Sequence, residues 1–194
     1  KSLRLDALGL VVAMLNADST SHDPTHIRKA LAKSLLPQLC NSVQEQWYKI
    51  IAQALKALTA VPQFFVIGFA DGEESSEEKT KQMKIVSTLL FETIEPLLAA
   101  HDVDQEIKEG ALRANASLLS DLHSTLSSEQ TTRLLELLLD RLKYDTTRIV
   151  AINTLNTIAS ADVSTGDKID LSKILGQMIE SLAGFLKYQS RALR

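Results

Sequence analysis

The stretch DRLKYDTTRIVAINTLNTIA, Asp140 to Ala159, joins a polar beginning to an apolar pattern of helical period. Arg148 stands at the junction, three residues before Ala151. A small residue at such a position lets the backbone of a neighbouring helix approach closely while larger apolar side chains interdigitate around it. Other parts of the chain are built in the same way, so this stretch is one copy of a repeated element.

The repeated element is a helix that carries an alanine three residues after its first residue. The copies are RLDALGLVVAML from Arg4, IAQALKALTAV from Ile51, KEGALRANASLL from Lys108 and RIVAINTLNTIA from Arg148, with Ala7, Ala54, Ala111 and Ala151 aligned, and Arg191 starts a fifth. Successive starts lie 47, 57, 40 and 43 residues apart. Before the later copies, amphipathic patterns predict a second, outer helix over 25–42, 84–100, 128–143 and 171–188. Two helices in about 40 to 47 residues is the period of HEAT and armadillo arrays, so we predict an all-α fold, an α-solenoid of HEAT (armadillo-like) helical-hairpin repeats.

This period predicts how the chain is divided. We expect residues 1–194 to be a fragment of one solenoid, with an inner helix of a truncated repeat over 1–16, helical hairpins over 24–61, 84–122 and 127–160, and a partial repeat over 170–194. The sequence DGEESSEEKTK over 71–81 has low hydrophobicity and predicts a flexible acidic insertion. The alternative is an acidic docking strip or a phosphorylation site at Ser75 or Ser76. Uncapped solenoid ends expose apolar surface, so the fragment is expected to self-associate.

Local signals support the predicted helices. Three helix starts carry a capping residue: Ser127 with Gln130 three residues later, Asp23 before Pro24, and Asp170. Two prolines, Pro37 and Pro96, fall inside predicted outer helices. A proline there removes a hydrogen-bond donor and crowds the preceding turn, so both helices are expected to bend.

Composition bears on the class of function. The 194 residues are 45% hydrophobic and carry a formal net charge of -3, with no basic run, which disfavours nucleic-acid binding because phosphate contacts need a concentrated positive face. The only cysteine, Cys40 in LLPQLCNSV, excludes an internal disulfide and is interpreted as a small core residue. No apolar run approaches the roughly 18 residues that span a membrane, and no signal-peptide pattern is present, so we expect a soluble intracellular protein with no membrane contact.

Chemical motifs are missing from the sequence. His22 and His26 have the spacing of two metal ligands on a helix, but Pro24 places them in a turn, and zinc needs three or four ligands. There is no HExxH, glycine-rich phosphate loop, GxSxG or paired-cysteine motif. We therefore expect no catalytic residue, no metal, no cofactor and no enzymatic activity.

Arg148 has two interpretations. With Asp145 three residues before it, and Lys108 preceded by Asp104 in the neighbouring copy, it fits a ladder of acidic and basic side chains between the starts of adjacent inner helices. The other interpretation is a contact with a partner on the concave face of the solenoid. Both hold together if the ladder lies at the edge of that face.

Four segments in order resemble a known family. DVDQEIKEGA (102–111) followed by LLSDL (118–122), then LLDRLKYDTTRIVAINTLNTIA (138–159), KIDLSKIL (168–175) and LAGFLKYQSRALR (182–194) are similar to the middle HEAT repeats of the cullin-associated, neddylation-dissociated proteins. The resemblance covers the C-terminal half closely. It covers the first hundred residues more loosely, through LRLDALGLVVAML and WYKIIAQALKAL. Gly110 departs from it, since the family usually has a larger residue there.

The resemblance implies a scaffold and exchange factor that wraps the unmodified cullin of cullin-RING ubiquitin ligases, in the cytoplasm and nucleus, and regulates their assembly. Contacts with cullin are expected near the starts of the inner helices, at Lys108, Tyr144, Arg148, Tyr188 and Arg191. The alternative is a HEAT scaffold of another class, such as a nuclear-transport receptor or a phosphatase scaffold. Such a scaffold would share the period without the four ordered segments.

Overall fold

The computed structural model describes residues 2–17, 28–69, 76–161 and 169–192. Within these ranges the chain is all-α, as predicted, and contains no strand. Its α-helices are α1 (Ser2–Asn16), α3 (Leu36–Ser42), α4 (Tyr48–Phe69), α5 (Ser76–Ala99), α6 (Gln105–Leu122), α7 (Ser128–Leu142), α8 (Asp145–Ser160) and α9 (Ser172–Ala192). A π-helical turn, Leu31–Leu35, leads into α3, and a 3₁₀ turn, His123–Thr125, follows α6.

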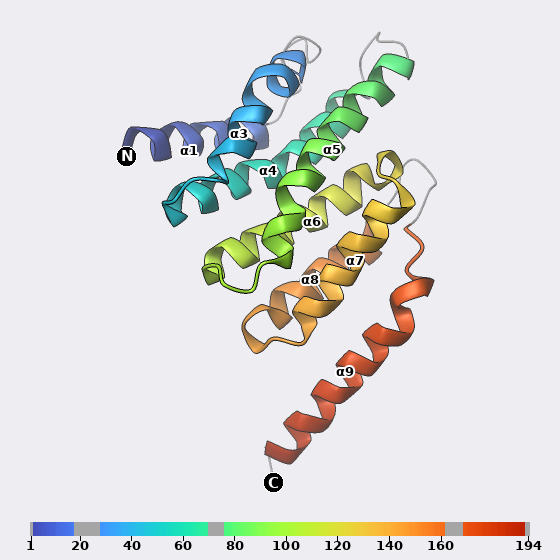
Figure 1. Cartoon of the computed structure of the whole chain (residues 1–194). Helices are drawn as coiled ribbons and strands as arrows, with labels where there is room; N and C mark the ends of the chain where they lie inside the picture. The colour runs from blue at the N-terminus through green and yellow to red at the C-terminus, as the bar shows by residue number, and fades with distance from the viewer. Residues whose placement is uncertain (1, 18–27, 70–75, 162–168, 193–194) are drawn as a thin grey trace.

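The helices form two layers (Figure 1). Helices α3, α5, α7 and α9 pack side by side in the layer nearer the viewer, which we call the A layer, and α1, α4, α6 and α8 form the B layer behind it. Helices α3 and α4, α5 and α6, and α7 and α8 also pack against each other as hairpins. Each hairpin therefore contacts its neighbours along the chain, which is the arrangement of an α-solenoid. The predicted fold class is confirmed.

Lys56 of α4 and Glu106 of α6, which form an ion pair, are 50 residues apart. Five other polar contacts between successive repeats have similar, shorter sequence separations. They are Arg4 with Glu45, Gln105 with Thr146, His101 with Arg141, Arg133 with Glu95, and Thr154 with the carbonyl of Leu112, at separations of 41, 41, 40, 38 and 42 residues. Equivalent points of neighbouring hairpins are thus about 40 residues apart. This is the spacing of HEAT and armadillo repeats rather than the shorter one of about 34 residues in tetratricopeptide repeats.

The predicted alanine register holds for three of the four copies. Ala54, Ala111 and Ala151 are fully buried where α4, α6 and α8 pack against one another. Ala7 of α1 is exposed, which corrects the prediction for this helix. Helix α1 is rotated so that it packs against the core through other apolar side chains, Leu8, Val11, Val12 and Leu15. Because α1 is apolar on nearly every side, its pattern alone did not fix which side faces α4.

The prolines affect their helices in different ways. Pro37 lies in the first turn of α3, where the π-helical turn ends, while Pro96 lies inside α5 as predicted. Pro62 lies inside α4, which continues beyond the predicted end at residue 61 to Phe69. An interior proline costs about 3 kcal/mol. Burial of Phe64 and Phe65 in the following turn stabilises α4 by about 1.5 to 3 kcal/mol each, which offsets that cost.

Two of the predicted caps are formed. The Gln130 backbone NH donates to Ser127 Oγ at 3.1 Å, and the Ser127 NH donates to Gln130 Oε1 at 2.9 Å, so the capping box is confirmed. Asp170 Oδ1 accepts from the Ser172 NH at 2.9 Å, at the start of α9. Asp23, Pro24 and the histidines at 22 and 26 lie outside the described residues.

The structure describes only part of the acidic segment 71–81. Residues 71–75, with Ser75, lie outside the described ranges, whereas Ser76 begins α5. Glu77 and Glu78 occupy the first turn of α5, where carboxylates interact favourably with the positive end of the helix dipole. Helix α5 begins eight residues before its predicted start at Lys84. Residues 76–81 are therefore helical, which corrects the predicted flexible insertion for this part of 71–81.

The first and last helices expose apolar side chains. Leu3 of α1 is 81% exposed and Leu186 of α9 is 68% exposed, and Leu10, Met14, Leu175 and Ile179 are also exposed on these two helices. Such side chains favour the expected self-association, which stays a prediction.

Candidate interaction site

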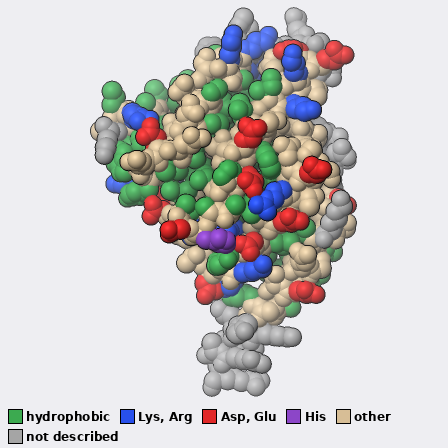
Figure 2. Space-filling view, in the orientation of Figure 1, with side chains coloured by type: hydrophobic (Ala, Val, Ile, Leu, Met, Phe, Trp, Pro, Cys, Tyr) green, Lys and Arg blue, Asp and Glu red, His purple; other side chains and the backbone are tan. Residues whose placement is uncertain are grey.

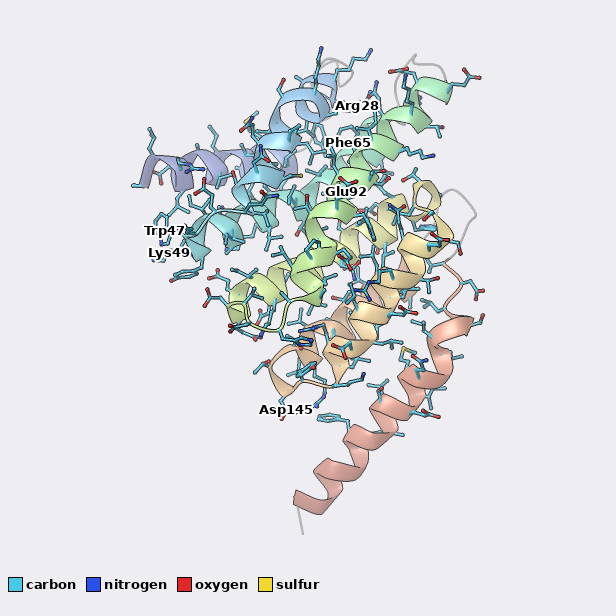
Figure 3. The ribbon with its side chains drawn as sticks, in the orientation of Figure 1. Arg28, Trp47, Lys49, Phe65, Glu92 and Asp145 are labelled. Atoms are coloured by element: carbon cyan, nitrogen blue, oxygen red, sulfur yellow. The ribbon has the colours of Figure 1, made fainter. Side chains whose placement is uncertain are left out.

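Arg148 joins the two helices of one hairpin. Its Nε donates to the carbonyl of Leu142 at 2.8 Å and its Nη2 to the carbonyl of Lys143 at 3.1 Å, so it satisfies carbonyls at the C-terminus of α7. Its Nη1 forms an ion pair with Asp145, which lies at the start of α8 (Figure 3). The Arg148 side chain is only 16% exposed, and its planar guanidinium reaches all three acceptors at once.

The same guanidinium also contacts the next repeat. Its central carbon lies 4.4 Å from the centre of the Phe185 ring in α9, a cation–π distance. The predicted ion pair with Asp145 is present, but it lies inside one hairpin and not between adjacent inner helices. The polar contact between the starts of α6 and α8 is made instead by Gln105, whose Nε2 donates to the carbonyl of Thr146 at 2.6 Å.

Tyr144 lies at the N-cap of α8 and is 42% exposed. Its ring centre is 5.7 Å from that of His101 and 5.2 Å from the guanidinium carbon of Arg141. Arg141 is buried, and its Nη2 lies 3.3 Å from both His101 Nδ1 and Asp140 Oδ2. One face of Tyr144 therefore stabilises the junction with the preceding repeat, and the remaining part of the ring faces solvent.

Lys108 lies one turn into α6 and is half-buried. Among the residues that the structure describes it forms no ion pair, so the predicted pairing of Lys108 in the ladder is not present there. Its ammonium group is available to another molecule. Tyr188 and Arg191 belong to α9, and their side chains lie outside the described part of the structure.

These positions share an edge of the molecule. Lys108, Tyr144 and Arg148 all lie near the N-termini of B-layer helices, with a charge, a ring and a buried guanidinium respectively. Sequence reasoning missed three residues that hold this edge together, His101, Gln105 and Phe185. Their separation of about 40 residues from their partners is the signal that could have found them, because that is the repeat period.

The described residues were compared with the requirements of a metal site, a reactive thiol and a membrane span. No group of three or more His, Cys, Asp or Glu side chains there has the geometry to hold a metal ion. Burial raises the pKa of the Cys40 thiol, which keeps it in its less nucleophilic protonated form. No helix in the described ranges is both long and apolar enough to cross a membrane.

Two layers of stacked hairpins define a helical-repeat protein. Comparison with known proteins then gives the family. Residues 1–115, more than half of the chain, match the family model described as "CAND1-like, TPR repeats". The chain belongs to this CAND1-like family, which confirms the resemblance seen in the sequence.

Curated relatives match over the whole chain. The chain is 30% identical over 193 residues to the Cullin-associated NEDD8-dissociated protein 1 of Dictyostelium discoideum and 25% identical over 193 residues to that of Drosophila melanogaster. It is 28% identical over 193 residues to the Cullin-associated NEDD8-dissociated protein 2 of Rattus norvegicus. In each case the match covers 100% of this chain and 14% of the relative. The chain therefore spans about one seventh of the length of these relatives.

Proposed function

We propose that this chain is a section of a scaffold and exchange factor that wraps unmodified cullin and regulates the assembly of cullin-RING ubiquitin ligases by protein binding. The observation that supports this proposal most is the match over the whole chain to relatives named as cullin-associated and NEDD8-dissociated. A nuclear-transport or phosphatase scaffold shares the period only, so it is the weaker candidate. The role proposed is binding without catalysis, in the cytoplasm and nucleus.

The architecture supports a binding role of this kind. Stacked hairpins present one side of each B helix on a continuous surface, where affinity is distributed over many modest contacts. A section of one seventh of the length is expected to bind cullin more weakly than the whole relatives. In this proposal Lys108 and the exposed part of Tyr144 contact the cullin, together with Tyr188 and Arg191 of α9.

Arg148 has a different part in the proposal. It is mostly buried and bonds to α7, α8 and α9, so it holds Tyr144 and the start of α8 in position. Reversal of its charge would disturb the fold as well as the surface. Arg148 is therefore unsuited to a test of binding, and Lys108, without an ion pair among the described residues, is the better choice.

The test measures binding of this chain to an immobilised cullin-RING complex, with and without NEDD8 attached to the cullin. The chain is expected to bind the unmodified complex, and Lys108→Glu to weaken binding about fivefold, or about 1 kcal/mol. Lys84→Glu is the matched control, because Lys84 is an exposed lysine of the A layer. Absence of binding to the unmodified complex, or equal binding to the modified one, would overturn the proposal. If Lys108→Glu and Lys84→Glu weaken binding equally, the N-terminal edge of the B layer is not part of the cullin-binding surface.

A further inference from the structure

A polar groove crosses the B layer. It has a volume of about 470 Å³, and its walls come from α4, α6 and α8. Hydrophilic side chains line most of it, among them Gln63, Arg113, Ser117, Asp121, Asn153 and Thr157. In the alanine register, Arg113 and Asn153 occupy equivalent positions of α6 and α8, as do Ser117 and Thr157, so the groove follows the repeat.

Several polar groups in the groove are not used by the fold. Gln63 and Asn153 are exposed, and within the described ranges their carboxamides form no hydrogen bond. Ser117 Oγ donates to Asp121 Oδ2 at 3.1 Å, which leaves the other carboxylate oxygen of Asp121 available. The groove therefore offers donors and acceptors on three successive helices.

The carboxamides of the groove can pair with an extended main chain. A carboxamide both donates and accepts, as a peptide group does, so each can pair with the main chain of an extended segment. Helices α4 and α8 lie on either side of α6, and packed helices are about 8 to 10 Å apart. Gln63 and Asn153 are therefore on helices about 16 to 20 Å apart, which is the length of about five or six extended residues at about 3.3 Å each.

Asp121 indicates the charge of the segment. Burial raises the pKa of this carboxyl group, and the hydrogen bond from Ser117 lowers it less than burial raises it. A lysine or arginine side chain placed against Asp121 would stabilise the ionised carboxylate. The other charged group in the lining, Arg113, is already paired with Glu109 at 3.0 Å.

Two other classes of partner fit the groove less well. Nucleic acid requires several cations, whereas Arg113 is the only cationic side chain in the lining and is itself paired. On the opposite, A-layer side, acidic and basic side chains are interspersed (Figure 2). An amphipathic helix requires a trough of large apolar side chains for its anchor residues, whereas Ala116 and Val150 are the only apolar residues described in this lining.

We propose that the groove binds an extended polypeptide segment of about five or six residues. Its peptide groups pair with Gln63 and Asn153, and one lysine or arginine side chain pairs with Asp121. This goes beyond the function proposed above, since it does not depend on the partner's being cullin. The groove lies on the exposed side of α6, away from the N-terminal edge that carries Tyr144 and Arg148.

The test selects peptides from a displayed library of short random sequences against the whole chain. Enriched peptides are expected to share one lysine or arginine, and to bind Asp121→Asn about tenfold more weakly, or about 1.4 kcal/mol. The double variant Gln63→Ala, Asn153→Ala should also bind more weakly. Asp102→Asn, the same change at an exposed loop position, should bind normally, and circular dichroism verifies that each variant is folded.

Three results would overturn the proposal: no enrichment, enriched peptides that bind the groove variants and the wild type equally, or enriched peptides that are amphipathic helices without a shared basic residue. Replacement of a peptide residue outside the basic position by proline distinguishes the two conformations. An extended peptide tolerates proline at a main-chain position that does not donate, whereas a helix is broken. Because no cullin is present, failure here is separate from failure of the cullin proposal.

Discussion

Gly110 of α6 faces Leu55 of α4 so closely that a Cβ atom at position 110 would lie 3.1 Å from Leu55 Cδ1 and 3.2 Å from Leu55 Cβ. Glycine weakens the interior of a helix by about 0.5 to 1 kcal/mol relative to alanine. The absence of a side chain lets two B-layer helices approach, so this weakening of α6 is offset by close packing. It also gives a physical reason for glycine at a position where the resembling family usually has a larger residue.

Gly110→Leu is therefore expected to lower the free energy of unfolding by about 1 to 3 kcal/mol, because the added side chain must separate α4 from α6. Urea unfolding followed by circular dichroism measures the change. Gly176→Leu in α9 is the matched control, since among the described residues no atom beyond the adjoining helix backbone lies within 4 Å of a Cβ atom added there. It should leave stability unchanged or raise it, as leucine is the better helix former. Similar losses in both variants would contradict the close contact.

Ala151→Phe is expected to lower the free energy of unfolding by about 1 to 3 kcal/mol. Ala151 is fully buried among α8's neighbours, and a ring there must displace them. Ala7→Phe is the comparison, because Ala7 has the same place in the repeat pattern but is exposed in α1. An unchanged melting temperature for Ala151→Phe would argue against the packing at this register.

Arg148→Ala is expected to destabilise the chain by about 1.5 to 3 kcal/mol, because it leaves two carbonyl groups at the end of α7 without their charged donor. Arg148→Lys should recover only part of this loss, since one ammonium group cannot reproduce the planar fork. Arg113→Ala removes an arginine whose ion pair with Glu109 is exposed, and should cost less than about 1 kcal/mol. Thermal and urea unfolding of the three variants test the order. Equal losses for Arg148→Ala and Arg113→Ala would contradict it.

Asp121 is expected to make stability depend on pH. Its pKa is raised in the folded chain by burial, so the folded state binds a proton more readily than the unfolded state does. Its contribution to stability is thus most favourable below the ordinary carboxyl pKa, and it is lost as the pH rises through the raised pKa. Asp121→Asn should raise the melting temperature at neutral pH, with a difference that shrinks as the solution is acidified.

The exposed Asp102→Asn change provides the baseline for this measurement, since it removes the same charge without relieving burial. A pH profile of Asp121→Asn parallel to that of the wild type would show that Asp121 is well solvated. The same pKa predicts that a basic peptide binds the groove more weakly at acidic pH, because the protonated carboxyl group offers no counter-charge.

The sequence identified the fold through features that act locally and recur. Apolar periodicity, the capping box of Ser127 and Gln130, and the spacing of buried alanines at 54, 111 and 151 all report on single helices and their nearest neighbours. In a solenoid each repeat contacts only adjacent repeats, so a pattern that recurs about every 40 residues already specifies most long-range contacts. The four ordered segments indicated the family, which the family model over residues 1–115 and the relatives over the whole chain confirmed.

Tertiary structure was needed where several elements act together. Helix α1 is apolar nearly all round, so only its packing on α4 shows that Ala7 faces outward. In the sequence, Pro62 indicates a helix end. The structure shows that α4 continues past it, because the rings of Phe64 and Phe65 are buried in the following turn. Arg148 has partners on α7, α8 and α9, which only the packing of these helices shows. The groove around Asp121 is formed where α4, α6 and α8 meet. Helix propensity and repeat period can be derived from the order of the residues. The rotation of a helix, the burial of a side chain and the meeting of side chains from different helices depend on which helices pack together.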